Sequence, residues 1–252
     1  MSSEAFVLRL QDYREADRIV WLLSNEHGRL SALARGARNS RRRFTGQIDL
    51  FQRVRVEFAH RRGQGRLATL TEARALSSYP LLRQDPGRFA IACVVAELLT
   101  RIAPEGDIDP ALFDCVGLVL ETLADEKIAP GLGLAAAAVV RLLTAAGFVT
   151  NWIHCARCGR AVPSLEQPER ERQPFALEHG GALVCGDCLS PRGTARRLSA
   201  ADCLWLAQAC RRMECAPATT SPGNVIGAAF DVLRGVTSGP LKAERFLFEI
   251  LR

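Results

Sequence analysis

Two groups of residues in this sequence have types and spacings suited to binding. The first is a run of arginines, five within the nine positions from Arg35 to Arg43. Guanidinium groups stay charged and donate hydrogen bonds in a planar fork that matches two phosphate oxygens. A solvated charge run on the surface would have the same composition. The position of these arginines inside a small-barrel pattern, described below, favours phosphate binding.

The positive charge of the chain is concentrated around this run. Between Arg35 and Arg66 there are ten arginines against Asp49 and Glu57, a local balance of +8 in a chain whose total is +6. Focused positive charge of this kind favours a polyanionic partner, and nucleic acid before membrane, because no basic amphipathic helix is present. The residues we predict to bind nucleic acid are Arg35, Arg38, Arg41, Arg42, Arg43, Arg61, Arg62 and Arg66.

The second group comprises two Cys-x-x-Cys pairs, Cys155 with Cys158 and Cys185 with Cys188. Each pair lies beside a glycine in a knuckle-like turn, which lets two thiolates converge on one ion, and two such turns complete a tetrahedral zinc site. Two local redox pairs, or buried structural thiols, are the alternatives. The spacing predicts one structural Zn bound by these four cysteines. The remaining cysteines on apolar helical faces, Cys93, Cys115, Cys203 and Cys210, are expected to lie in the core.

Few residues could support an enzymatic reaction. Four thiolates saturate zinc and leave no open position for a reactive water. A zinc nucleobase deaminase requires His-x-Glu followed by Pro-Cys-x-x-Cys, but Val184 precedes Cys185. The phosphate-binding pattern Gly-x-x-x-x-Gly-Lys-Ser/Thr does not occur. We therefore expect no enzymatic activity, since a metal-dependent nucleic-acid enzyme would also need acidic clusters.

Short strands are predicted to position the arginines. Segments with strand character cover residues 4–10, 18–23, 29–34, 53–58 and 67–73. The alternation is clearest in the fourth segment, where Val54, Val56 and Phe58 share one face. A basic connection, compatible with a helix, joins the third and fourth segments. Five short strands with such a connection fit the partly open OB-fold barrel, which commonly presents one face and its loops to single-stranded nucleic acid.

Helices are predicted after Pro80, where the apolar period changes. Asp85-Pro86 and Asp109-Pro110 place a capping residue before a proline at the first helical position, and Ser199 with Asp202 forms a capping box. The expected class is α+β, with an N-terminal five-stranded OB-fold β-barrel and an α-helical C-terminal domain containing a four-cysteine zinc-finger insertion. The expected boundaries are 1–78 for the barrel, 79–150 and 191–252 for the helical domain, and 151–190 for the zinc finger.

Composition places the chain among ordinary globular proteins. It has 252 residues, of which 48% are apolar and 24% charged. No targeting segment and no membrane span are recognised in the sequence. Nine cysteines, an odd number, argue against a complete disulfide framework and fit a reducing compartment. We therefore expect a cytoplasmic protein, and binding to DNA would make it nucleoid-associated.

Several stretches together resemble the bacterial recombination mediators of the RecO family. They are the sixteen residues from Ala5 to Val20, His27-Gly28-Arg29-Leu30-Ser31, Ala34 to Arg38, Asn151 to Cys155, the second cysteine knuckle, and Gly239 to Phe246. The resemblance thus covers the chain. One difference is that the basic run after Gly36 is almost wholly arginine, where the family commonly has lysine. This difference should preserve phosphate binding without sequence preference.

The resemblance implies a fold and a function. It implies an OB-fold, a helical domain and a zinc finger, and a protein that binds and anneals single- and double-stranded DNA. It also implies partners: the C-terminal tail of single-strand-binding protein (SSB), RecR, often RecF, and RecA indirectly. The alternative that the residues leave open is a zinc-ribbon transcription or RNA-binding factor built on the same barrel.

The resemblance further implies that the helical part receives the SSB tail in a hydrophobic groove with a basic rim. Arginines that could rim such a groove are Arg141, Arg211 and Arg212, and the apolar residues beside them are Leu142, Leu143, Leu206 and Met213. The alternative is that these arginines merely cover the core with their aliphatic stems.

Overall fold

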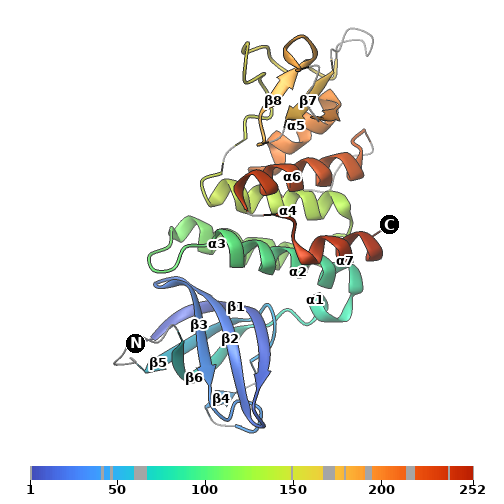
Figure 1. The fold of residues 1–252 in the computed structure, drawn as a ribbon. Coiled ribbons are helices and arrows are strands. Elements are labelled where there is room, and N and C mark those ends of the chain that lie inside the picture. Colours follow the sequence, from blue (N-terminus) through green and yellow to red (C-terminus); the bar gives the residue numbers. More distant parts are fainter. Residues whose placement is uncertain are drawn as a thin grey trace. The chain divides into compact units, whose positions relative to one another are not determined.

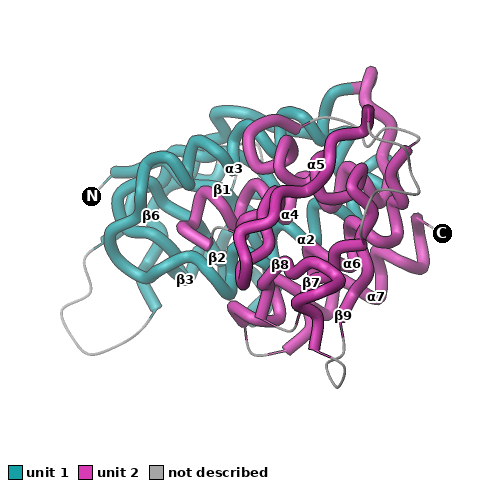
Figure 2. The backbone as a smooth tube through the Cα atoms, turned by 90° about the horizontal axis from the view of Figure 1, so that it is seen from above, with its two compact units in different colours: residues 1–125 teal, residues 126–252 magenta. Residues whose placement is uncertain are grey.

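A computed structural model describes residues 2–40, 43–45, 48–59, 67–148, 150–166, 174–178, 180–190, 195–213, 219–237 and 239–251. The chain divides into two compact units, residues 1–125 and residues 126–252, which are coloured separately in Figure 2. The first unit contains the candidate nucleic-acid surface and the second contains the four-cysteine cluster.

The first unit begins with a closed β-sheet, drawn mostly in blue in Figure 1. Its strands are β1 (Ser2–Tyr13), β2 (Asp17–Ser24), β3 (Gly28–Ala34), β4 (Phe44–Thr45), β5 (Arg53–Ala59) and β6 (Ala68–Ser77). β1, β2 and β3 pair antiparallel in sequence order, and β5 pairs antiparallel with both β1 and β6. A short parallel pairing of β3 with β6 closes the sheet into a barrel.

The barrel confirms the five predicted strands. Alternate residues fill its interior, including Val20, Leu22, Val54, Val56 and Leu70, and each of these is at most 2% exposed. The connection between β3 and β5 differs from expectation. Its described residues, 35–40, 43–45 and 48–52, form turns and the two-residue strand β4 rather than a helix.

Three helices complete the first unit: α1 (Leu81–Gln84), α2 (Pro86–Ile102) and α3 (Pro110–Leu123). The predicted caps are present, because the side chains of Asp85 and Asp109 accept hydrogen bonds from the first turns of α2 and α3. The helices pack against the outside of the barrel. The rings of Phe6 on β1 and Phe113 on α3 lie 4.8 Å apart, and Gly117 leaves room for Phe6. α2 and α3 therefore share a core with the strands.

A second contact joins the barrel to the loop after α2. Gly28, at the start of β3, has a left-handed φ of +57°, and a Cβ there would lie 2.5 Å from the carbonyl oxygens of Pro104 and Gly106. The backbone N–H of Arg29 donates to the Pro104 oxygen, and the Arg29 guanidinium pairs with Glu105 at 2.9 Å. Only glycine permits this approach at position 28.

The second unit combines helices with a small sheet. α4 (Leu132–Ala145), α5 (Ala200–Ala209), α6 (Pro222–Val236) and α7 (Lys242–Ile250) are the helices, and the strands are β7 (Phe175–Glu178), β8 (Leu183–Cys185) and β9 (Ala195–Leu198). The three strands are antiparallel in the order β8-β7-β9. The capping box of Ser199 and Asp202 is formed at the start of α5, as predicted.

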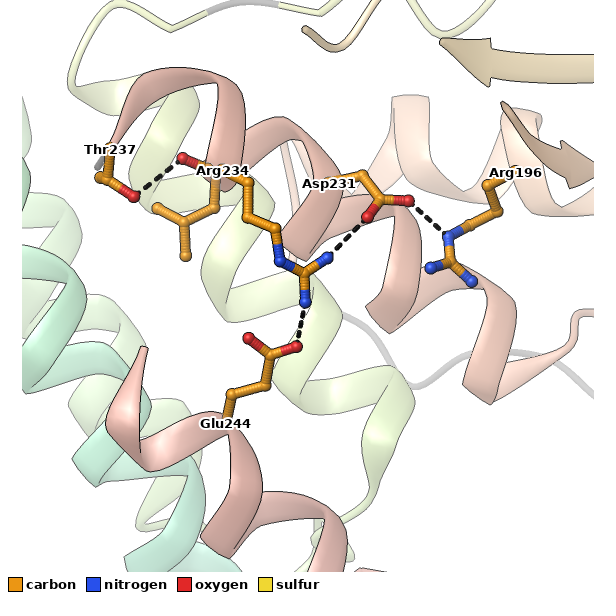
Figure 3. A network of polar contacts seen from close by, with 6 residues as sticks. Arg196, Asp231, Arg234, Thr237 and Glu244 are labelled. Carbon is orange, nitrogen blue, oxygen red and sulfur yellow. Dashed lines mark hydrogen bonds and ion pairs between the residues drawn. The ribbon is translucent and has the colours of Figure 1, made fainter. Parts of the chain in front are cut away.

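An ionic network links β9, α6 and α7 in the second unit (Figure 3). Asp231 on α6 pairs with Arg196 of β9 and with Arg234, each at 2.7 Å, and Arg234 also pairs with Glu244 of α7. Gly227 makes room for this network, because a Cβ there would lie 2.4 Å from Cζ of Arg196. Glu244 belongs to Gly239–Phe246, one of the stretches that carry the family resemblance. The residue type at position 244 is explained by its ion pair, which packs α7 against α6.

Candidate nucleic-acid interface and metal centre

The arginine run begins in a turn that directly follows β3. Gly36 takes a left-handed φ of +66°, and its backbone N–H donates to Oδ1 of Asp17 at 2.8 Å. The backbone N–H of Arg38 donates to the carbonyl of Ala16, and the Arg38 guanidinium donates to the carbonyl of Glu15. The turn between β1 and β2 therefore holds the turn after β3 in place by three hydrogen bonds.

The described arginines of this run are all exposed to solvent. They are Arg35, Arg38 and Arg43. Arg38 also approaches Asp12 at 3.8 Å, and Arg43 donates through Nη2 to the carbonyl of Arg35 at 3.2 Å. The other predicted DNA-binding residues, Arg41, Arg42, Arg61, Arg62 and Arg66, lie outside the described residues.

The four predicted zinc ligands come together in the second unit. The sulfur atoms of Cys155, Cys158, Cys185 and Cys188 all lie within 4.8 Å of one another, and those of Cys158 and Cys185 are 3.7 Å apart. A tetrahedral zinc with Zn–S bonds of about 2.3 Å requires sulfur atoms about 3.8 Å apart. The cluster fits such an ion, because its donors are four thiols at nearly this spacing.

Backbone hydrogen bonds shape both knuckles. In the first, the N–H of Gly159 donates to the carbonyl of Cys155 and the N–H of Cys155 to the carbonyl of Arg160, while Gly159 takes a φ of +73°. In the second, β8 leads into a 3₁₀ turn, Gly186–Cys188. The N–H of Ala156 donates to the carbonyl of Leu183 and so joins the first knuckle to β8.

Two arginines also bridge the knuckles. Arg157 donates to the carbonyl of Cys188 at 2.6 Å and to both carboxylate oxygens of Glu178 on β7 at 2.9 Å. Arg160 pairs with Asp187 at 2.7 Å. These contacts orient backbone around the sulfur ligands, which is a common way for proteins to hold a metal site in shape. The cysteine spacing alone does not reveal these contacts, although Arg157 lies within the first Cys-x-x-Cys-Gly pattern and Arg160 directly after it.

The thiols of the cluster differ in acidity. Burial acts to raise the pKa of Cys155, but backbone N–H groups of Cys185, Cys158 and Arg157 outweigh it and lower the pKa to about 6. Hydrogen bonds to the sulfurs of Cys158 and Cys185 raise the pKa of Cys188 to about 12. Cys155 is therefore ready to act as a thiolate ligand, whereas Cys188 would have to lose its proton when an ion binds.

The remaining described cysteines belong to the core or its edge. Cys115 and Cys203 are buried, and Cys93 and Cys210 are partly buried. Burial raises the pKa of Cys93 to about 11 and that of Cys203 to about 12, so both are kept as neutral thiols. Within the described residues, none of the four belongs to the metal-binding cluster.

The suggested tail groove is closed at three of its four apolar residues, and only Met213 is partly exposed. Leu142, Leu143 and Leu206 are at most 1% exposed, so they are core residues and present no free surface. Arg211 and Arg212 are exposed after α5. Helical spacing identified the buried face correctly, but it could not distinguish a core face from a groove.

Within the described part of the chain, no helix has the length and apolar character of a membrane span.

Family models match most of the chain. One, described as "Recombination protein O N terminal", matches residues 1–79, and another, "Recombination protein O C terminal", matches residues 83–234. The first covers the barrel, and the second includes all four clustered cysteines.

Curated proteins named "DNA repair protein RecO" are similar over most of their length. The protein of Pelobacter propionicus is 36% identical over 185 residues, which are 73% of this chain and 70% of that protein. The protein of Geobacter metallireducens is 33% identical over 74% of this chain and 71% of its own length. That of Anaeromyxobacter dehalogenans strain 2CP-C is 38% identical over 72% of this chain and 68% of its own length.

Proposed function

The chain belongs to the recombination protein O (RecO) family of DNA repair and recombination proteins, and we propose that it acts as a non-enzymatic recombination mediator. In this role it binds single- and double-stranded DNA, anneals complementary strands and engages SSB. With RecR, and with RecF, it helps to load RecA. The observation that carries this proposal is an arginine-bearing turn held on the side of a small barrel.

The turn supports DNA binding through its geometry and charge. Arg35, Arg38 and Arg43 are exposed. The β1–β2 turn fixes the backbone around Arg35 and Arg38, and the carbonyl of Arg43 accepts a hydrogen bond from the N–H of Ala73 on β6. A fixed backbone lowers the entropy lost when the guanidinium groups bind phosphates. We include Arg41, Arg42, Arg61, Arg62 and Arg66 in the proposed contact set on the basis of charge alone. Contacts to phosphate explain binding without sequence preference.

We propose that the four cysteines hold one structural zinc ion. The donor type and the sulfur spacing support this assignment. When bound, the ion would cross-link the two knuckles. It would not take part in a reaction, because four protein thiolates leave no open coordination position. Arg157 and Arg160 would keep the knuckles oriented around it.

Strand annealing tests this function. Complementary oligonucleotides, one carrying a fluorophore and the other a quencher, are mixed with the protein, with and without prior coating by SSB. We expect the protein to accelerate annealing of both bare and SSB-coated strands. A protein that binds DNA but leaves SSB-coated strands unannealed would instead fit the transcription or RNA-binding alternative.

A further inference from the structure

A hollow of about 530 Å³ opens on the outer side of the barrel, next to the arginine turn. Its floor consists of Ile19, Leu33, Leu67 and Thr69. Ile19 on β2 is the register partner of Leu33 on β3, and Leu33 is the register partner of Thr69 on β6. These side chains therefore form one row across three strands, where β3 and β6 close the barrel. The volume lies within the range of about 300–1,000 Å³ typical of small-molecule sites.

Three of the four floor residues are aliphatic and only partly covered, whereas the rim around them is polar. Ile19, Leu33 and Leu67 are each partly exposed, whereas their neighbours Val20 and Ala34 point into the core and are buried. A phosphate on this floor would lose much of its hydration and would find only the Thr69 hydroxyl as a donor, while the flat face of a nucleobase would bury apolar surface there favourably.

The rim supplies an aromatic ring and two cations. Tyr13, at the end of β1, is 39% exposed, and the guanidinium of Arg14 lies 5.3 Å from its ring centroid. Arg14 has a left-handed φ of +56°, which is uncommon for a residue with a side chain. Arg35 lines the hollow as well, so the arginine turn and the hollow are continuous.

Asp17 also lines the hollow, and its Oδ1 is occupied by the N–H of Gly36. A carboxylate in this place repels phosphate but can accept hydrogen bonds from the amino groups of a nucleobase. The hollow and the turn thus differ in preference, because the turn suits the backbone of a strand and the hollow suits its bases.

From this arrangement we infer that the hollow receives an unpaired nucleobase, stacked on Tyr13, while Arg35 and Arg14 contact the adjoining phosphates. The ligand class is a single strand whose bases are unstacked, because a paired base inside a duplex cannot reach the floor. This inference rests on the proposed DNA-binding function and adds a source of preference for single strands over duplex. Stacking of a base on an aromatic side chain is insensitive to which base is bound.

The test compares an oligothymidylate with an abasic oligonucleotide of the same length, which carries the same phosphates without bases. Fluorescence anisotropy is measured with the full-length protein and with Tyr13→Leu and Tyr13→Phe. We expect the wild-type protein to bind oligothymidylate at least about fivefold more tightly than the abasic strand. Tyr13→Phe should keep this ratio and Tyr13→Leu should lower it towards one, while affinity for the abasic strand and for duplex stays unchanged. Phe148→Leu, which changes an aromatic residue of similar exposure outside the barrel, is the matched control and should keep the wild-type ratio.

A second measurement uses only the wild-type protein and so does not depend on how a variant folds. An oligonucleotide containing 5-iododeoxyuridine is irradiated in the complex, and the adducts are mapped after tryptic digestion. We expect an adduct on the peptide Leu10–Arg14, in which Tyr13 is the single aromatic residue.

The outcomes separate the two proposals. If the wild-type protein binds both oligonucleotides equally well, or if Tyr13→Leu keeps the full preference, the base site is overturned while DNA binding stands. An absence of adducts on the Tyr13 peptide would also overturn it. Binding to neither oligonucleotide would overturn the proposed function itself, and the base site with it.

Discussion

The carboxylate of Asp17 accepts a hydrogen bond from the backbone N–H of Gly36 at 2.8 Å, across two turns that are separated in sequence by β2 and β3. An acidic residue therefore shapes the most basic part of the chain. Its charge opposes DNA binding, and its hydrogen bond supports DNA binding by fixing the turn that presents Arg35 and Arg38.

The first prediction separates these two effects of Asp17. Asp17→Asn removes the charge but keeps an oxygen acceptor, so affinity for single-stranded DNA should rise or stay equal. Asp17→Ala removes both and should lower the free energy of unfolding by about 1–2 kcal/mol. It should also weaken DNA binding, although the protein becomes more positive. Anisotropy titrations and thermal melting measure both quantities. Tighter binding by Asp17→Ala would show that charge alone matters there.

The second prediction concerns salt. With about five phosphate contacts, the logarithm of affinity for single strands should fall with the logarithm of salt at a slope of about −3.5. Arg35→Gln should make this slope shallower by about 0.7, because one contact is lost. Reversal of Arg41, Arg42 and Arg43 to Glu should flatten it further and weaken binding to all sequences alike. Arg245→Gln, on the exposed face of α7, is the control and should leave the slope unchanged. Equal slopes in all proteins would identify the run as an ordinary solvated surface.

The third prediction concerns metal. Elemental analysis should find about one Zn per chain, and a strong chelator should lower the melting temperature. Replacing Cys155 and Cys185 with Ser should abolish zinc binding and the response to chelator. Cys210→Ser, a partly buried thiol outside the cluster, should leave the zinc content intact. The assignment would be contradicted if the protein contained no zinc and its melting temperature were the same with and without chelator.

Removal of the Arg157 side chain probes the same site more gently. Arg157→Ala deletes the hydrogen bonds to Cys188 and Glu178 but leaves all four sulfurs. Zinc affinity should fall about 10- to 100-fold, the usual effect of losing a group that orients ligands. Competition with a chromogenic chelator measures this change, and an unchanged affinity would mean that the thiols alone hold the knuckles in place.

The fourth prediction concerns the SSB tail. An isolated tail peptide should bind the full-length protein more weakly as salt rises, and deletion of its terminal apolar residue should abolish binding. Arg211→Glu with Arg212→Glu should weaken binding, because the tail is acidic, whereas Arg245→Glu should not. Titration calorimetry measures each case. The full chain is needed, because α2 and α3 share a core with the barrel and a fragment from residue 80 would lose the partner of Phe113.

The fifth prediction concerns pH and Glu244. Burial raises the pKa of this carboxyl above its ordinary value despite the pairing with Arg234. A raised folded-state pKa contributes stability that is fully present below the unfolded value of 4.5 and is lost as pH rises through the folded value. Glu244→Gln should therefore not lose stability as the pH rises through this range, and near pH 7 the variant should be at least as stable as the wild-type protein.

Thermal melting across the acidic and neutral range tests this, with Glu249→Gln as the control. Glu249 lies on the same helix and pairs with Arg245 in solvent, so its neutralisation should change stability little at any pH. A marked loss of stability in Glu244→Gln near pH 7 would show that the pair with Arg234 outweighs the cost of burial.

Local chemistry made much of this fold predictable. The strands were predicted from alternation such as that of Val54 and Val56, and helix starts from Asp109-Pro110 and the Ser199 capping box. The four cysteines could be grouped because each Cys-x-x-Cys turn brings two sulfurs together without help from distant residues.

Contacts between distant segments could not be predicted in the same way. The sequence after β3 is compatible with a helix. In the structure it forms a turn, because the Asp17 carboxylate binds the N–H of Gly36 and Gly36 takes a left-handed φ. Tyr13 lies in the sequence within the polar connection between the first two predicted strands, although β1 extends to it. Only the register of β2, β3 and β6 places an apolar row beside it. From the sequence, Leu142 and Leu206 could equally line a core or a groove. Helical spacing identifies the apolar face of a helix, but it does not show whether another part of the protein covers that face.

The two-sided burial of β1 bears on how the protein is made. Val7 points into the barrel and Phe6 points outward against Phe113, so β1, which is synthesised before the other elements of this unit, needs partners from both ends of the unit. Until α3 has been synthesised, Phe6 and its apolar neighbours remain without their final cover. The nascent barrel is therefore expected to stay open to chaperones and proteases through most of the translation of the first unit, and to become resistant once Phe113 is available.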